Sequence, residues 1–162
     1  LEELVALSQT VLKGRDFKNG EKMYRAARCV VCHRFAGDGG STGHDLTQAA
    51  GRFSFKDLAE SIIDPSKVIS DQYKTNVVTT KDGKSYTGRI VGVTNDSFTL
   101  LIDPEDSTKL VTVKKSDVEE QHLSPVSLMP KDLLNQLNQN EVMDLFAYIL
   151  SRGNAKDQMF KK

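Results

Sequence analysis

The hydrophobic period of the chain changes twice, and this change limits the folds that the chain can adopt. Apolar residues recur at helical spacing up to about residue 69 and again after residue 125. Between these segments lie short runs rich in Val, Ile, Thr and aromatic residues, separated by turn signals such as Asp82-Gly83 and Asn95-Asp96. The sequence therefore predicts a mainly helical domain with an inserted antiparallel β-meander or small barrel, an α+β fold overall.

The two ends of the chain are expected to form one helical core. Leu4, Leu7 and Val11 share one stripe of the first predicted helix. Capping residues and apolar stripes place four helices, at 1–13, from Asp16 to about Arg28, from Ser54 to Ile63, and from Asn138 to a stop at Gly153. Residues 36–43 are predicted to be a Gly-rich loop, and Pro65 to begin a short turn or helix.

The insert is expected to contain four or five strands, enough to bury one apolar face. The predicted strands cover 77–80, 86–93, 98–102, 110–113 and 118–122. We therefore divide the chain into a helical core of residues 1–73 and 125–153, a β insert of residues 74–124, and a polar tail of residues 154–162.

The segment Cys29-Val30-Val31-Cys32-His33 carries the clearest chemical signal. Cys-x-x-Cys-His is the attachment motif of c-type haem. Two thiols three positions apart can reach the two vinyl groups of one porphyrin, and the next residue then offers its imidazole to the iron. The motif predicts one covalent haem on Cys29 and Cys32, with His33 as an axial ligand.

Other interpretations of the motif are a redox dithiol, a zinc site and a chance occurrence. A thioredoxin-type dithiol follows a strand and opens a helix, whereas this motif is predicted to close a helix and lead into a loop. A structural zinc site needs four ligands. His44 and His122 could complete the set in number, but they form no second paired motif.

Met129 is the predicted second axial ligand. It lies in the irregular stretch Ser127-Leu128-Met129-Pro130, where a following proline can hold a loop rigidly over a haem face. A Met and His pair is a common ligand set in cytochromes c. The competing donors are placed in helices, in the tail, in the loop after the motif or in the insert: Met23, Met143, Met159, His44 and His122.

Several motifs together resemble class I cytochromes c. The resemblance rests on the Cys-x-x-Cys-His motif, on Gly20 and Tyr24 one turn apart, on Met129-Pro130 and on Leu145-Phe146-Ala147-Tyr148. It implies that the first and last core helices cross at Gly20, Tyr24 and Tyr148. It also implies that a backbone carbonyl in Gly43-His44-Asp45-Leu46 accepts a hydrogen bond from His33, with His44 standing where the family usually has proline.

A wider set of motifs resembles the haem-binding domain of Planctomycetes and Verrucomicrobia, over about residues 13–153. These motifs are Gly39-Gly40, Gly43 to Thr47, Arg52-Phe53, Glu60 to Ser66, Asp82-Gly83, Pro125 to Pro130, and Asp144 to Tyr148. The resemblance implies an extracytoplasmic or periplasmic domain at the end of a large protein similar to membrane-bound dehydrogenases. It also makes Arg52 a candidate partner of a haem propionate, because guanidinium pairs well with carboxylate.

Charge and composition exclude some classes of function. The 162 residues carry no net charge, which argues against a dedicated nucleic-acid binder. No apolar run approaches the ~20 residues of a membrane span. Seven basic and two acidic side chains lie between Lys13 and Arg34, a local excess of five positive charges around the motif. The chain begins at Leu1 without a Met, which we interpret as a fragment or a processed form.

The expected function is one-electron transfer by a haem with two protein ligands. The domain is not expected to be an enzyme itself, and its partner would be a redox protein or a fused dehydrogenase domain. Two alternatives remain open at this point. One is a haem enzyme or gas sensor with an open sixth site, and the other is a docking module in which the haem is structural.

Overall fold

A computed structural model describes the backbone of residues 1–162 and every side chain except those of residues 7–11. Leu7 and Val11 of the predicted first stripe therefore lie outside the described side chains. The chain divides into two compact units, one formed by Leu1–Pro65 with Lys131–Lys162 and the other by Ser66–Pro130. The predicted β insert, residues 74–124, falls inside the second unit.

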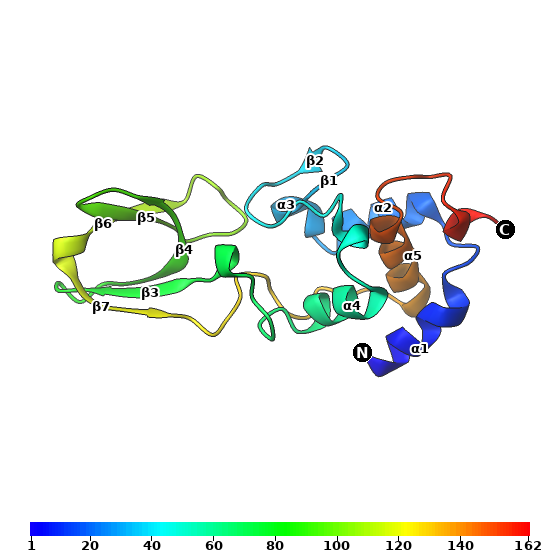
Figure 1. The fold of residues 1–162 in the computed structure, drawn as a ribbon, viewed down its shortest axis with the longest axis horizontal. Helices are drawn as coiled ribbons and strands as arrows, with labels where there is room; N and C mark the ends of the chain where they lie inside the picture. The colour runs from blue at the N-terminus through cyan, green and yellow to red at the C-terminus, as the bar shows by residue number, and fades with distance from the viewer. The chain divides into compact units, whose positions relative to one another are not determined.

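The first unit contains all the α-helices (Figure 1). They are α1 (Glu2–Val11), α2 (Phe17–Ala26), α3 (Cys29–Cys32), α4 (Phe55–Ile63) and α5 (Gln139–Leu150). Asp16 caps α2, and complete capping boxes begin α4 at Ser54 and α5 at Asn138, which confirms the predicted helix starts. No helix in the described part of the chain is long and apolar enough to cross a membrane.

The cysteine motif differs from its prediction, because it does not close the preceding helix. Helix α2 ends at Ala26, and Arg28 takes a left-handed conformation with φ of 63°. A separate single turn, α3, then carries both cysteines. The left-handed residue breaks the helical hydrogen bonding and turns the chain, so the motif starts a new helical turn.

Three other segments differ from their predictions. The predicted loop 36–43 contains β2 (Asp38–Gly39), which pairs with β1 (Arg34–Phe35), just before the loop, as a small hairpin. Helix α5 was predicted to stop at Gly153. The first left-handed residue after the helix is instead Arg152, with φ of 56°. The expected polar tail folds back, because the backbone N–H of Arg15 donates to the Met159 carbonyl (2.9 Å).

Helices α2 and α5 cross at the predicted glycine. A Cβ at Gly20 would lie 2.4 Å from the Asp144 carbonyl oxygen and 2.6 Å from the Tyr148 Cβ. Tyr24 packs beside Tyr148, with ring centroids 5.8 Å apart. Leu145, Phe146 and the rest of the apolar stripe of α5 are buried, and Phe146 packs on Phe55 of α4 with ring centroids 4.8 Å apart. The predicted contact of Gly20, Tyr24 and Tyr148 is therefore confirmed.

The second unit is a five-stranded antiparallel sheet with strand order β6-β5-β4-β3-β7. Its strands are β3 (Asn76–Thr80), β4 (Ser85–Val93), β5 (Ser97–Leu101), β6 (Leu110–Lys114) and β7 (Val118–Leu123), close to the five predicted runs. Val78, Phe98, Leu100 and Val113 form its core.

Strand β4 changes partner along its length. Its first residues, up to Gly88, pair with β3, and from Arg89 onward it pairs with β5. A Cβ at Gly88 would lie 2.4 Å from the Leu101 carbonyl oxygen, so the two strands approach closely at this corner.

The two ends of the second unit are tied to each other. Strands β3 and β7 pair from Asn76 with Leu123. Outside the ladder, the Thr75 hydroxyl donates to the Val126 carbonyl (3.1 Å), and the Ser127 N–H donates to the Ser66 hydroxyl (3.1 Å). The first and last residues of the β unit therefore lie next to each other.

Candidate functional site

The single turn α3 holds the two cysteines in distinct surroundings. The His33 N–H donates to the Cys29 carbonyl (2.9 Å), which closes the turn. Cys29 is buried, Cys32 is partly buried, and neither is in a disulfide. Burial raises the pKa of the Cys29 thiol to about 12. Reactive dithiols have lowered pKa values, so this environment disfavours the redox-dithiol interpretation.

The His33 imidazole is fixed by a backbone hydrogen bond. Its Nδ1 lies 2.7 Å from the His44 carbonyl oxygen. A carbonyl can only accept, so Nδ1 carries the proton and Nε2 keeps a free lone pair, which is the form that ligates a metal. Burial lowers the pKa of His33, although the hydrogen bond to His44 acts in the opposite direction. The carbonyl contact implied by the family resemblance is therefore present.

Glycines allow the following loop to wrap closely around the motif. A Cβ at Gly43 would lie 2.7–3.1 Å from three atoms of the His33 ring, and one at Gly40 would overlap the Val31 carbonyl. The Gly43 N–H donates to the Cys32 carbonyl (2.8 Å). The loop therefore packs against the imidazole of His33 at Gly43 and is hydrogen-bonded to the cysteine motif.

An aromatic cluster supports the motif from the helix crossing. The Tyr24 hydroxyl donates to the His33 carbonyl (2.9 Å), and burial raises the pKa of this phenol. Phe35 packs on Tyr148 with ring centroids 4.8 Å apart, and Phe17 also packs on Tyr148, at 5.1 Å. The α2–α5 crossing thus positions the backbone that carries the imidazole.

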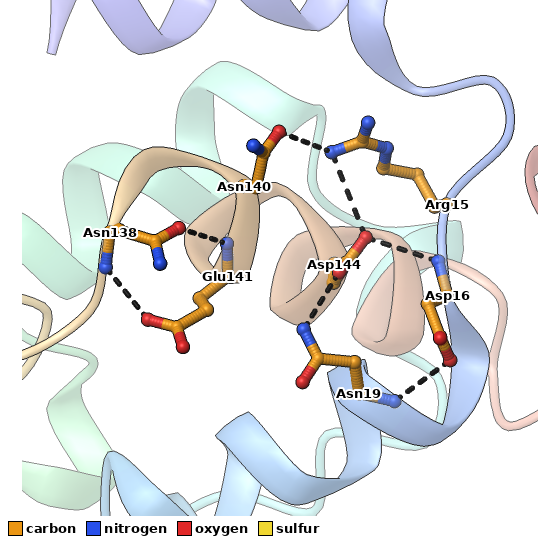
Figure 2. Close-up of polar contacts among 7 residues, drawn as sticks. All are labelled: Arg15, Asp16, Asn19, Asn138, Asn140, Glu141 and Asp144. Carbon is orange, nitrogen blue, oxygen red and sulfur yellow. Dashed lines mark hydrogen bonds and ion pairs between the residues drawn. The ribbon is translucent and has the colours of Figure 1, made fainter.

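Asp144 joins the two helices through polar contacts that the sequence did not predict (Figure 2). Its carboxylate accepts from the Asp16 N–H (3.1 Å) and the Asn19 amide (2.8 Å), and it lies 3.7 Å from Arg15 Nη1. The sequence signal is an acidic residue inside the apolar stripe of α5, in Val142-Met143-Asp144-Leu145. A buried carboxylate needs such partners.

The other predicted site residues are less constrained. Arg52 and the His44 side chain are exposed, and the His44 carbonyl is the group that contacts the His33 ring. His122 is exposed on β7, with its ring 3.6 Å from the Glu120 carboxylate. Met129 belongs to the second unit, is partly buried, and its N–H donates to the Ser127 hydroxyl (3.1 Å).

The basic cluster between Lys13 and Arg34 is partly neutralised. Arg15 lies near the Asp144 carboxylate, and Arg25 forms an exposed ion pair with Asp38. The hydrogen bond and charge of Asp38 raise the pKa of Arg25. Asp38 lies just outside the counted cluster, so the local excess of positive charge is smaller than the sequence indicated.

The comparisons with known proteins agree with this geometry. The family model for cytochrome c matches residues 17–112, more than half of the chain, and the chain belongs to the cytochrome c family. No curated protein gives a significant match. Proteins of this family bind haem c covalently and transfer electrons with redox partners, so the chain is a haem protein of electron transport.

The residues of the motif fit such a group. Two thiols that form no disulfide lie in one turn, and the neighbouring imidazole is held in the tautomer that leaves a nitrogen free. In the part of the chain with described side chains, no three His, Cys, Asp or Glu residues gather as a metal site, which disfavours the zinc interpretation.

Proposed function

We propose that one haem is attached through Cys29 and Cys32 and that His33 is its proximal ligand. The observation that carries this proposal is the 2.7 Å contact between His33 Nδ1 and the His44 carbonyl. This contact holds the ring and its tautomer, while the packing of Gly43 against the imidazole limits ring rotation. The bound haem supplies an iron that changes between the ferric and ferrous states.

We further propose Met129 as the second axial ligand. It is the methionine in an irregular segment, with Pro130 after it and the Ser127 hydroxyl accepting its N–H. By contrast, Met23 and Met143 are buried within α2 and α5. A thioether ligand favours the ferrous state relative to a stronger donor.

On this basis the domain carries one electron at a time and leaves no open iron site for a substrate. We propose that it accepts electrons from a dehydrogenase, either fused in the same protein or separate, outside the cytoplasm. The motifs shared with the haem-binding domain of Planctomycetes and Verrucomicrobia support this assignment. Arg52 is proposed as a partner of a haem propionate, through guanidinium–carboxylate pairing.

Two measurements test these assignments. The protein made with a c-type maturation system should keep its haem mass after denaturation and acid–acetone treatment, and Cys29→Ala with Cys32→Ala should lose it. Haem that is fully extracted from the unmodified protein would refute covalent attachment.

For the second ligand, Met129→Ala should remove the sulfur-to-iron absorption band of the ferric state and let the ferrous state bind carbon monoxide. Met159→Ala, a partly buried methionine in the C-terminal turn, is the matched control and should leave the spectrum unchanged. Rapid carbon monoxide binding by the unmodified protein would instead support a sensor or enzyme with an open site. An unaltered spectrum in Met129→Ala would exclude this ligand.

A further inference from the structure

The carbonyl group of His33 is enclosed within the helical unit. The Tyr24 hydroxyl, from α2, donates to its oxygen (2.9 Å). Gly39 of β2 lies so close that an added Cβ would be 2.2 Å from the same oxygen. His33 follows the single turn α3 and has an extended backbone, with φ of −107° and ψ of 132°. The chain therefore leaves the cysteine motif through a peptide group that both α2 and the hairpin contact.

The packing of Tyr24 fixes the position of its hydroxyl. The residue is 3% exposed, and its ring centroid lies 5.6 Å from that of Phe35 and 5.8 Å from that of Tyr148. A buried ring that is packed on two others has little rotamer freedom, so the O–H group stays directed at the His33 oxygen. The helix crossing needs only the aromatic ring, and the hydroxyl therefore serves the contact with His33.

Tyr148 shows the difference between a ring and a hydroxyl at this crossing. It is also buried, and it packs on Tyr24, Phe35 and Phe17. Its hydroxyl has no hydrogen-bond partner among the described residues. Tyr148 therefore contributes packing without a polar contact to the segment that carries the ligand.

Three hydrogen bonds hold His33, and they come from different parts of the unit. Its N–H donates to the Cys29 carbonyl, and its Nδ1 donates to the His44 carbonyl, so these two bonds come from the motif and from the loop that follows it. The third bond, from Tyr24, comes from the crossing of α2 and α5. It links a packed helix pair to the backbone that carries the imidazole.

We propose that Tyr24 is a positioning residue for the axial ligand, an inference that rests on the proposed ligation by His33. Its hydroxyl fixes the His33 peptide group relative to α2 and α5, and the peptide group in turn fixes the orientation of the imidazole plane. Groups that hydrogen-bond around a metal ligand set its orientation, and a buried carbonyl that loses its donor is destabilised. Tyr24→Phe should therefore change the orientation of the imidazole while it keeps the ring at the crossing.

The first experiment compares ¹H NMR spectra of the ferric holoprotein and two variants. In a low-spin ferric haem, the spread of the haem-methyl resonances depends on the orientation of the axial imidazole plane. Tyr24→Phe should change this spread. Tyr148→Phe is the matched control, because it removes a hydroxyl without a partner from the same crossing, and it should keep the pattern of the unmodified protein.

The second experiment measures the exchange of the His33 Hδ1 proton with deuterium in the ferrous holoprotein. Loss of the bond from Tyr24 should speed this exchange by about three- to tenfold, the effect expected for one buried hydrogen bond. The backbone amides of α4, in the same unit, are the internal reference, because a general loss of stability would speed their exchange as well. Tyr148→Phe should leave both exchange rates unchanged.

The positioning role requires two results in Tyr24→Phe, an altered haem-methyl pattern and a faster Hδ1 exchange with unchanged α4 amides. Either measurement at the value of the unmodified protein overturns the proposal. Equal effects in Tyr148→Phe, or α4 amides that exchange faster together with Hδ1, also overturn it, because they indicate only weaker packing. Failure of the proposed function is distinguishable, since the His33 ring protons of the unmodified ferric protein would then lack the large shifts of an iron-bound imidazole.

Discussion

Replacing Gly20 by Ala tests whether the close crossing of α2 and α5 holds the helical unit together. The added Cβ would lie 2.4 Å from the Asp144 carbonyl oxygen and 2.6 Å from the Tyr148 Cβ, whereas ordinary contacts begin near 3.4 Å. Both neighbouring atoms are fixed to α5, so no flexible side-chain end can give way. The helices must therefore separate by about 1 Å.

The expected free-energy change is the difference of two opposing effects. Overpacking a well-filled core costs about 1–3 kcal/mol, and a contact with helix backbone falls at the upper end of that range. Alanine in place of glycine within a helix stabilises the helix by about 1 kcal/mol. We therefore expect Gly20→Ala to lower the free energy of unfolding by about 2 kcal/mol.

Urea unfolding of the ferric holoprotein, followed by far-ultraviolet circular dichroism, measures this change. Gly92→Ala is the control, because its nearest atom, the Thr99 Cβ, would lie at an ordinary 3.7 Å. That variant should stay within about 0.5 kcal/mol of the unmodified protein. A Gly20→Ala protein that is as stable as its parent would show that the helices separate at no cost, and would refute the reasoning.

Three further variants test the polar groups of the helical unit. Asp144→Asn removes the charge beside Arg15 and should cost about 1–3 kcal/mol in urea unfolding, and a neutral result would mean that the network adds no stability. Hydrogen bonds from Ser54, the N-cap residue of α4, hold the pKa of Asp57 below its ordinary value. The stability that the ionised Asp57 adds to the fold is therefore present above about pH 4, and it is lost as the pH falls through the lower pKa of the folded state. The melting temperature of Asp57→Asn should therefore fall less than that of the unmodified protein between about pH 5 and 3, and the same pH profile in both proteins would contradict this. Lys18→Glu with Lys22→Glu should slow electron transfer to an acidic acceptor at low salt in stopped-flow experiments, whereas a rate independent of ionic strength would leave the basic cluster without a steering role.

Local signals were sufficient for most elements. The five strands follow from period-two patterns, and the caps at Asp16, Ser54 and Asn138 depend on side chains within a few residues. The elements that escaped prediction depend on backbone conformations that residue type does not favour. Arg28 and Ala36 take positive φ values, so the separate turn α3 and the small hairpin leave little trace in the sequence.

Contacts between distant segments were harder to predict. Phe160 packs on Phe17 with centroids 5.3 Å apart, and this docking of a polar tail requires the folded surface of α2. The partners of Asp144 lie more than a hundred residues earlier in the chain.

Within the site, the His44 carbonyl contact was predictable from the family motif that follows the cysteines. The assignment of Met129 stays a prediction, because it depends on how the β unit meets the helical unit, which the spacing of ligands along the chain does not determine.

The paired ends of the β unit have a consequence for how the helical unit folds. Helices α2 and α5 must meet although a long stretch of chain separates Ala26 from Gln139, and the β unit makes up more than half of that stretch. Each doubling of a flexible loop raises its closure entropy cost by about 0.6 kcal/mol. Once β3 pairs with β7, the two ends of the β unit are held together, so the flexible chain between α2 and α5 is roughly halved in length. The entropy cost of closing that loop then falls by about 0.6 kcal/mol. Folding of the β unit first would therefore speed the closure of the helix pair.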